Sequence, residues 1–149
     1  MSPLKILLVD DHRENLEFLS QHFESLGWEV ILANNGKEAL EKVRTSRPNA
    51  IVLDMVMPEM DGFEVVRSLR NDPDFRHIPV LAATGLTRPG DRDRCLAAGC
   101  NDYMAKPFTS EDLEDHLANL LSAISSRAYA DETNYRAPAF PGNLAKKLT

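Results

Sequence analysis

The sequence has few cysteines, no long apolar run and fewer cations than anions, and each shortage argues against a class of protein. The two cysteines, Cys95 and Cys100, match neither a disulfide framework nor a metal-binding motif. No apolar stretch approaches the roughly 20 residues that cross a bilayer, and residues 1–3 lead straight into a strand-like segment without a signal peptide. The net charge of −6 disfavours generic binding to nucleic acid. We therefore expect a cytoplasmic protein that binds neither membranes nor nucleic acids.

What the sequence does contain is a regular alternation of short apolar runs with segments of helical period. Strands are expected at about residues 4–9, 28–33, 50–54, 79–84 and 101–105, and helices at about 13–26, 37–45, 63–70, 90–98 and 109–125. This alternation predicts a parallel sheet covered on both faces, so the fold class is α/β, a doubly wound three-layer sandwich. The chain of 149 residues has room for one such domain, over residues 1–125, and a tail over 126–149.

Polar residues stand where four of the apolar runs end. In order along the chain they are Asp10, Asp11, Asp54, Thr84 and Lys106. In open parallel sheets, ligands bind outside the carboxyl ends of the strands. We therefore expect carboxylates, a hydroxyl and an ammonium group to meet in a single pocket.

Three carboxylates in one pocket need a reason, because their charges repel. Two ionised carboxylates about 4 Å apart repel by roughly 4 kcal/mol at an effective dielectric constant near 20. A hard divalent cation supplies the reason, since Mg²⁺ typically takes one or two carboxylates together with waters and phosphate oxygens. The plainer interpretation is that Asp10 and Asp11 only cap the first helix. The presence of Asp54 at a matching strand end favours the cation site.

The same residues are suited to phosphoryl chemistry. A carboxylate can attack phosphorus to give an acyl phosphate, and Asp54 stands alone at the tip of an apolar strand. The transfer depends on neutralising the charge on the phosphoryl oxygens. Mg²⁺ and Lys106 can neutralise that charge, and Thr84 can donate a hydrogen bond to one oxygen. The residues themselves thus suggest that Asp54 is a phosphoacceptor assisted by Lys106 and Thr84.

Further motifs surround these residues. The full set is Asp10-Asp11, Asp54 with Met57-Pro58 and Asp61-Gly62, Thr84, Tyr103, and Lys106-Pro107-Phe108. Over about residues 4–125 it resembles the signature of response-regulator receiver domains of two-component signalling. The resemblance implies a flavodoxin-like five-stranded sheet in the order 2-1-3-4-5 with five helices.

The resemblance also implies a chemistry for the site. Asp54 would be phosphorylated by a phosphohistidine donor. Mg²⁺ would be held by Asp11, Asp54 and the backbone carbonyl of Val56, with Asp10 acting mainly through a water in the shell of the metal. A cis peptide bond between Lys106 and Pro107 would aim the lysine into the pocket.

Two residues match the switch pair of the family. Thr84 would move toward the phosphoryl group and leave space for the ring of Tyr103 to turn inward, which reshapes the surface of the predicted fourth helix, fifth strand and last helix. Without the resemblance, the simpler interpretation of Tyr103 is a half-buried strand residue whose hydroxyl lies in water. Val56 and Leu86 hold apolar positions that border the path of the hydrolytic water in this family, so we expect slow self-dephosphorylation.

The expected function is that of a signalling switch and not of an enzyme. The chain would accept a phosphoryl group from a sensor histidine kinase or a histidine phosphotransfer protein, and would then bind a downstream protein partner. The alternative is a phosphorelay shuttle that passes the phosphoryl group on to a histidine phosphotransfer protein, which the stretch over residues 90–100 favours by its similarity to relay receivers. Family members often pair when phosphorylated, so a homodimer through the reshaped surface is a further expectation.

Two other protein classes share parts of this pattern. An aspartyl-phosphate hydrolase of the haloacid dehalogenase type places a second Asp two residues after the nucleophile, and Val56 holds that position here. A flavodoxin-like electron carrier needs a hydroxyl- and glycine-rich loop after the first strand, whereas Asp10 and Asp11 would repel the flavin phosphate. The hydrolase is a remote alternative, and the electron carrier is rejected.

The tail over residues 126–149 has no clear period. Its charged residues are Arg127, Asp131, Glu132, Arg136, Lys146 and Lys147. They give the tail a net charge of +2 and leave −8 for the rest of a chain whose net charge is −6. The simplest expectation is a poorly ordered terminus. The alternative is an arm that docks on the acidic domain or on a partner through Tyr129, Tyr135 and Phe140.

Overall fold

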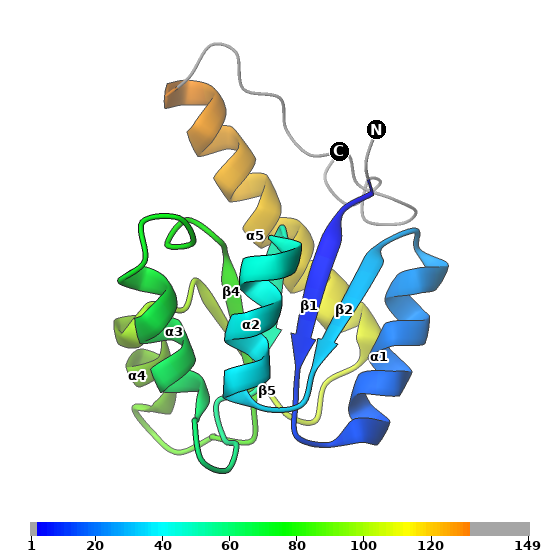
Figure 1. The fold of residues 1–149 in the computed structure, drawn as a ribbon, viewed down its shortest axis with the longest axis vertical. Coiled ribbons are helices and arrows are strands. Elements are labelled where there is room, and N and C mark those ends of the chain that lie inside the picture. The colour runs from blue at the N-terminus through cyan, green and yellow to red at the C-terminus, as the bar shows by residue number, and fades with distance from the viewer. Residues whose placement is uncertain (1–2, 132–149) are drawn as a thin grey trace.

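The computed structural model describes the backbone of residues 3–131 and the side chains of residues 3–122. It contains a five-stranded parallel sheet in the order β2-β1-β3-β4-β5 (Figure 1). The strands are β1 (Lys5–Val9), β2 (Glu29–Ala33), β3 (Ala50–Leu53), β4 (Val80–Thr84) and β5 (Asp102–Ala105), and the helices are α1 (Arg13–Ser25), α2 (Gly36–Ser46), α3 (Gly62–Arg70), α4 (Asp91–Ala98) and α5 (Ser110–Asp131). The predicted α/β fold and strand order are confirmed.

The predicted bounds agree with the structure to within one residue, except at the end of α5. This helix continues to Asp131, whereas the sequence predicted its end near residue 125. The apolar stripe stops there, but the next residues include Ala128 and Ala130 and no glycine or proline, and alanine is the strongest helix former. Residues 126–131 therefore belong to the helix and not to a tail. The rest of the predicted arm, residues 132–149, lies outside the described residues.

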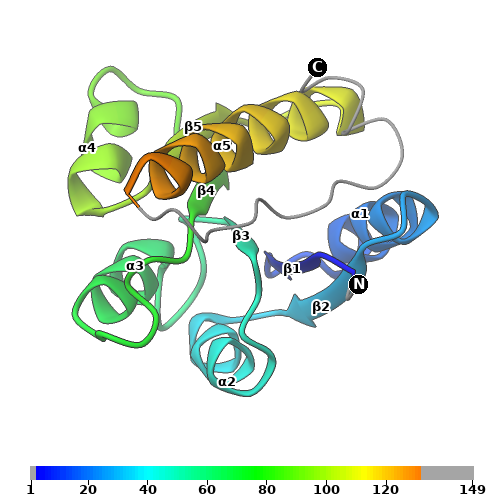
Figure 2. The ribbon, with the colours of Figure 1, turned by 90° about the horizontal axis from the view of Figure 1, so that it is seen from above.

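Two apolar layers, one on each face of the sheet, form the core. α1 and α5 pack on one face, and α2, α3 and α4 pack on the other (Figure 2). Successive strand residues point to opposite faces, so Ile6 and Leu8 belong to the first layer and Leu7 and Val9 to the second. Burial on both faces explains why the central strands read as continuous apolar runs.

α3 begins so close to the end of β3 that its first residue has no room for a side chain. A Cβ atom on Gly62 would lie 2.6 Å from Cα of Met55 and 2.8 Å from the backbone oxygen of Asp54. Asp61 caps the helix by accepting a hydrogen bond of 3.0 Å from the backbone N–H of Glu64. The start of α3 therefore packs directly against the backbone that carries Asp54.

Arg70, at the end of α3, holds the turn between α4 and β5. Its guanidinium donates hydrogen bonds to the carbonyl oxygens of Gly99 at 2.9 Å and Ile78 at 2.8 Å, and to Oδ1 of Asn101 at 2.9 Å. The fork of five N–H groups suits Arg to bind several loop acceptors at once. The sequence pattern did not single out this residue, because its partners lie on other elements.

Candidate functional site

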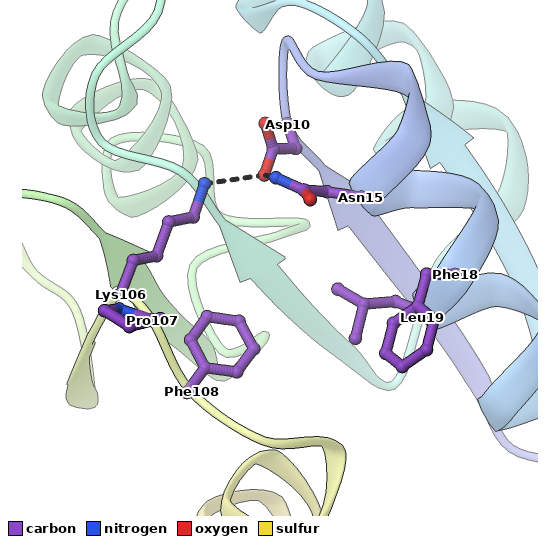
Figure 3. Close-up of a pocket in the computed structure, with 7 residues that line it drawn as sticks. All are labelled: Asp10, Asn15, Phe18, Leu19, Lys106, Pro107 and Phe108. Atoms are coloured by element: carbon purple, nitrogen blue, oxygen red, sulfur yellow. Dashed lines mark hydrogen bonds and ion pairs between the residues drawn. The ribbon is translucent and has the colours of Figure 1, made fainter.

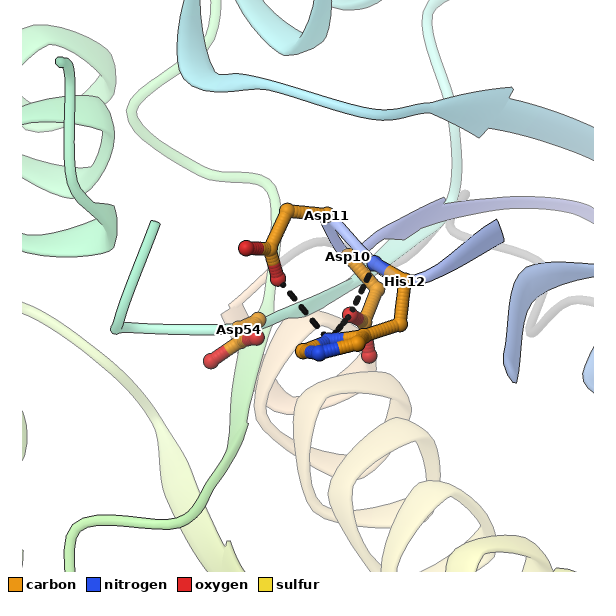
Figure 4. Close-up of side chains that lie close together, drawn as sticks. All are labelled: Asp10, Asp11, His12 and Asp54. Carbon is orange, nitrogen blue, oxygen red and sulfur yellow. Dashed lines mark hydrogen bonds and ion pairs between the residues drawn. The ribbon is translucent and has the colours of Figure 1, made fainter. Parts of the chain in front are cut away.

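The carboxyl ends of β1 and β3 bring the predicted acidic residues together. The two strands are parallel neighbours in register, so the residues that follow them lie at the same level. Ligand atoms of Asp10, Asp11, His12 and Asp54 all lie within 4.8 Å of one another (Figure 4). Asp10 and Asp54 are buried, with 5% and 4% of their surface exposed, whereas Asp11 is exposed.

Lys106 reaches this cluster from the end of β5. Its Nζ donates to Oδ2 of Asp10 at 2.7 Å (Figure 3). It also donates to Oδ2 of Asp54 at 3.3 Å. The Lys106-Pro107 peptide bond is cis, as the resemblance implied. The backbone N–H of Lys106 donates to the carbonyl of Thr84 at 2.8 Å, which ties the end of β5 to the end of β4. The ammonium group therefore contacts both buried carboxylates.

Thr84 and Tyr103 are joined through the backbone of Leu86. The buried Thr84 hydroxyl oxygen accepts a hydrogen bond of 3.3 Å from the Leu86 N–H. The Tyr103 hydroxyl donates to the Leu86 carbonyl oxygen. The hydroxyl of Tyr103 therefore has a protein partner, in contrast to the simpler interpretation that placed it in water.

Backbone amides orient the two buried carboxylates. The His12 N–H donates to Oδ1 of Asp10 at 2.8 Å, and the Val56 N–H donates to Oδ1 of Asp54 at 3.0 Å. The His12 ring is 70% exposed and its Nδ1 lies 3.2 Å from Asp10 and 3.1 Å from Asp11. The only sequence signal for His12 was its position beside the acidic pair. The side chain of Val56 is 53% exposed, so it lies at the open side of the site.

The two buried carboxyl groups differ in how far their charge is compensated. Burial raises the pKa of Asp54 above its ordinary value, although the Val56 amide and Lys106 act in the opposite direction. Burial acts in the same sense on Asp10, but hydrogen bonds from Lys106 and the His12 amide outweigh it and leave the pKa of Asp10 below its ordinary value. Lys106 thus compensates the negative charge of Asp10 more fully than that of Asp54. A further cation would therefore stabilise the ionised form of Asp54 more than that of Asp10.

The chemistry of the donors fits a hard divalent cation. Asp10, Asp11 and Asp54 offer carboxylate oxygens within bridging distance, and such oxygens are the ligands that Mg²⁺ prefers. The exposure of Asp11 leaves one side of the cluster open for the waters that Mg²⁺ usually keeps.

A family model described as the response regulator receiver domain matches residues 6–118. The matched region contains every residue of the site. This chain belongs to the response regulator receiver family. The resemblance noted in the sequence is thereby confirmed.

Individual response regulators are similar over most of this receiver domain. The polar-differentiation response regulator DivK of Brucella anthropi is 37% identical over 107 residues, which cover 72% of this chain and 87% of DivK. Other relatives are longer: the chain spans about half the length of several response regulators that it matches, 51% and 53% in two of them.

Solved receiver structures share the fold. The chemotaxis protein CheY4 of Vibrio cholerae has a TM-score of 0.76 and 33% identity, and the similarity covers 80% of this chain and all (100%) of CheY4. The receiver domain of the sensor histidine kinase PA1611 of Pseudomonas aeruginosa has a TM-score of 0.73 and 35% identity, covering 80% of this chain and 98% of that one. The PA1611 structure has a magnesium ion coordinated in its active-site cleft.

A groove runs from the receiver site along α1. Its volume is about 330 Å³, and it is lined by Asp10, Asn15, Phe18, Leu19, Lys106, Pro107 and Phe108 (Figure 3). The sequence analysis did not predict it. The one sequence signal for the groove was Phe18, a large apolar residue one position outside the apolar stripe of α1.

None of the helices within residues 3–131 is long and apolar enough to span a bilayer.

Proposed function

We propose that this receiver domain is a signalling switch turned on by phosphorylation of Asp54. The observation that carries the proposal is the position of the Asp54 carboxylate. It is buried, its Oδ1 accepts a hydrogen bond from the Val56 amide at 3.0 Å, and its Oδ2 lies 3.3 Å from Nζ of Lys106. A carboxylate fixed in this way beside a cation is a suitable nucleophile towards phosphorus.

In the proposed transfer, an oxygen of Asp54 attacks the phosphorus of a phosphohistidine on a kinase or phosphotransfer protein. The new P–O bond forms as the P–N bond breaks, and the imidazole nitrogen leaves with the electron pair. Lys106 neutralises part of the charge on the phosphoryl oxygens, and Thr84 can donate a hydrogen bond to one of them. The product is an acyl phosphate on the protein, so the role proposed is that of a switch and not of an enzyme with turnover.

Mg²⁺ is the proposed cofactor. Asp11, Asp54 and the backbone carbonyl of Val56 would hold it, with Asp10 acting through a water. When bound, it supplies positive charge to the oxygens of the phosphoryl group. Magnesium in the cleft of the similar PA1611 receiver supports this assignment.

In the proposed response, the backbone of Leu86 couples Thr84 to Tyr103. If Thr84 turns its hydroxyl toward the phosphoryl group, its hydrogen bond with the Leu86 N–H is lost, while Tyr103 binds the carbonyl of the same residue. The loop that starts α4 and the ring on β5 would then move together. A downstream protein partner would recognise the changed surface of α4, β5 and α5.

The direct test is intact-mass measurement after incubation with acetyl phosphate and Mg²⁺. The wild-type chain should gain the mass of one phosphoryl group, and Asp54→Asn should gain none. Asp74→Asn is the matched control, since Asp74 is exposed in the turn before β4. Loss of the signal in the control, or its persistence in Asp54→Asn, would contradict the assignment.

A relay role is the second candidate, favoured by the similarity to the receiver of a sensor histidine kinase. In that role the phosphorylated chain would pass the group from Asp54 to a histidine of a phosphotransfer protein. Transfer of ³²P between the two proteins, absent when that histidine is replaced, is the expected result.

A further inference from the structure

His12 places an imidazole nitrogen beside the carboxylates of the receiver site. Its Nδ1 lies 3.2 Å from Oδ1 of Asp10 and 3.1 Å from Oδ1 of Asp11 (Figure 4). Ligand atoms of these three residues and of Asp54 form the one group of this kind within residues 3–122. The magnesium site proposed above uses oxygen atoms alone, so it leaves the ring nitrogen without a role.

The spacing of these atoms is that of neighbouring ligands around one ion. Two ligands at right angles, each about 2.1 Å from a metal ion, lie about 3.0 Å apart. Nδ1 of His12 keeps nearly this distance from one oxygen of Asp10 and one oxygen of Asp11. Since a carboxylate only accepts hydrogen bonds, these contacts require a hydrogen on Nδ1. A metal ion can take the place of that hydrogen and join the same three atoms.

The surroundings favour a dication that enters from the solvent side. When ionised, the three carboxylates and the ammonium group of Lys106 leave two negative charges at the site. Asp10 and Asp54 are buried, whereas the His12 ring is 70% exposed. The ring thus lies on the outer side of the cluster, where it can complete the shell of an ion that the carboxylates bind.

An imidazole nitrogen changes which ions the cluster prefers. Mg²⁺ takes oxygen ligands and keeps several of its waters. Imidazole suits zinc, nickel, copper and iron, whereas carboxylate, carbonyl and water suit magnesium, calcium and manganese. A nitrogen beside three carboxylates is therefore better matched to Zn²⁺ or Co²⁺ than to Mg²⁺.

We propose that His12 makes the receiver site a binding site for a first-row transition-metal dication, represented by Zn²⁺ and Co²⁺. Nδ1 of His12 binds the ion together with carboxylate oxygens of Asp10, Asp11 and Asp54, and the ring proton is then on Nε2. The ion competes with Mg²⁺ for the same carboxylates. This competition rests on the proposed function, whereas the binding itself does not.

The ligand atom is tested by Zn²⁺ titration of the full-length chain, followed by the imidazole ¹⁵N signals of its four histidines. Nδ1 of His12 should shift to the position of a metal-bound nitrogen, while Nε2 stays protonated. The amide signal of Val56 should shift at the same Zn²⁺ concentrations, because this N–H donates to Asp54. Unchanged ring signals of His12 in the Zn²⁺-loaded chain, or shifts confined to the other three histidines, would overturn the proposal.

The selectivity is tested by calorimetry with Co²⁺ and with Mg²⁺ on full-length variants. His12→Ala should weaken Co²⁺ binding at least about tenfold and change Mg²⁺ binding less than about twofold, because only Co²⁺ loses a ligand. His12→Gln keeps a polar side chain without the imidazole and should behave like His12→Ala. His77→Ala is the matched control, since His77 is exposed in the loop before β4, at the opposite end of the strands. It should change neither affinity.

Three results of the calorimetry would contradict the proposal. Unchanged Co²⁺ affinity in His12→Ala would show that the ring is not a ligand. Equal weakening of Co²⁺ and Mg²⁺ binding would show that the ring acts only through its hydrogen bonds with the carboxylates. Mg²⁺ should also raise the Co²⁺ concentration needed for half-saturation, and no change would place Co²⁺ elsewhere. None of these measurements requires phosphorylation, so failure of the Asp54 assignment as phosphoacceptor would leave them intact.

Discussion

At the scale of single residues, the site concentrates negative charge that the rest of the protein only partly compensates. Lys106 lies 0.6 Å closer to Asp10 than to Asp54, at 2.7 Å against 3.3 Å. The pKa of Asp54 is raised chiefly by burial, with the charge of Asp10 adding to it, whereas that of Asp10 is lowered. Of these two buried carboxyl groups, the phosphoacceptor candidate is therefore the one whose ionised form is disfavoured by folding.

Asp54→Asn should stabilise the protein in the absence of divalent cations. A carboxyl group whose pKa is raised by folding stabilises the folded state below its unfolded pKa of 3.8 and loses that contribution as the pH rises through the folded value. The neutral amide avoids this loss and can still accept the Val56 hydrogen bond. We expect a gain of about 1 kcal/mol at neutral pH, smaller near pH 4. Urea unfolding with a chelator present measures it, and Asp74→Asn should give no such gain.

Val56 and Leu86 lead to a prediction about the lifetime of the phosphorylated state. Both side chains are apolar, so neither can hold an attacking water by a hydrogen bond. We expect the phosphorylated chain to decay slowly, and Val56→Asn to shorten its half-life several-fold by adding polar groups at an exposed position. Intact-mass measurements after removal of the donor follow the decay. A wild-type half-life of seconds would contradict this expectation.

At the scale of elements, the position of Asp54 depends on how tightly α3 approaches β3. Gly62 begins α3 in contact with the backbone of Met55 and Asp54, and Arg70 ends it by binding the turn before β5. The same helix thus touches the strand end that bears Asp54 and supports the strand that leads to Lys106. Changes at either end of α3 should therefore affect the positions of Asp54 and Lys106 in the site.

Gly62→Ala should destabilise the fold by about 2 kcal/mol, because its Cβ would meet Met55 Cα at 2.6 Å and the backbone oxygen of Asp54 at 2.8 Å. Gly85→Ala is the matched control, since no atom lies within 4 Å of the Cβ it would add. Its effect should stay within about 0.5 kcal/mol. Thermal or denaturant unfolding of the two variants distinguishes steric overlap from a general effect of replacing glycine. Equal destabilisation would argue against the close approach.

At the scale of the whole molecule, charge and apolar surface are divided between two regions. The site end carries the acidic cluster and the groove, while the surface of α4, β5 and α5 carries exposed charges of both signs, among them Arg92 and Asp93. Across this surface, Nδ1 of His116 on α5 lies 2.7 Å from Oδ2 of Asp102 on β5. Mixed charges on one face are suited to a self-complementary contact.

We predict that beryllofluoride, as a phosphoryl mimic, with Mg²⁺ will promote pairing through the surface of α4, β5 and α5. Arg92→Glu should weaken the pair at least about tenfold by placing like charges at the contact. Arg44→Glu, on α2, makes the same charge change on another face and should have little effect. Sedimentation at several concentrations measures the pairing. A constant monomer mass with the mimic bound would rule out the homodimer.

Much of the fold and of the candidate site could be predicted because both depend on regular geometry. Alternating apolar runs and helical periods determined the α/β class, and the carboxyl ends of parallel strands share one edge, which was enough to group Asp10, Asp54, Thr84 and Lys106. Other features depended on contacts between distant elements. Three hydrogen bonds show this, because each joins residues far apart in the chain. They run from Lys106 to Asp10, from Tyr103 to the carbonyl of Leu86, and from Arg70 to the carbonyl of Gly99.

The sequence by itself thus determined which residues stand at the strand ends and hence what chemistry they share, because local periodicity sets strand and helix positions. Only the tertiary structure decided how the charges pair, how far α5 extends and that Phe18 faces Phe108 across an open groove. Those outcomes follow from packing, in which small shifts of one element decide which side chains of another come within contact distance.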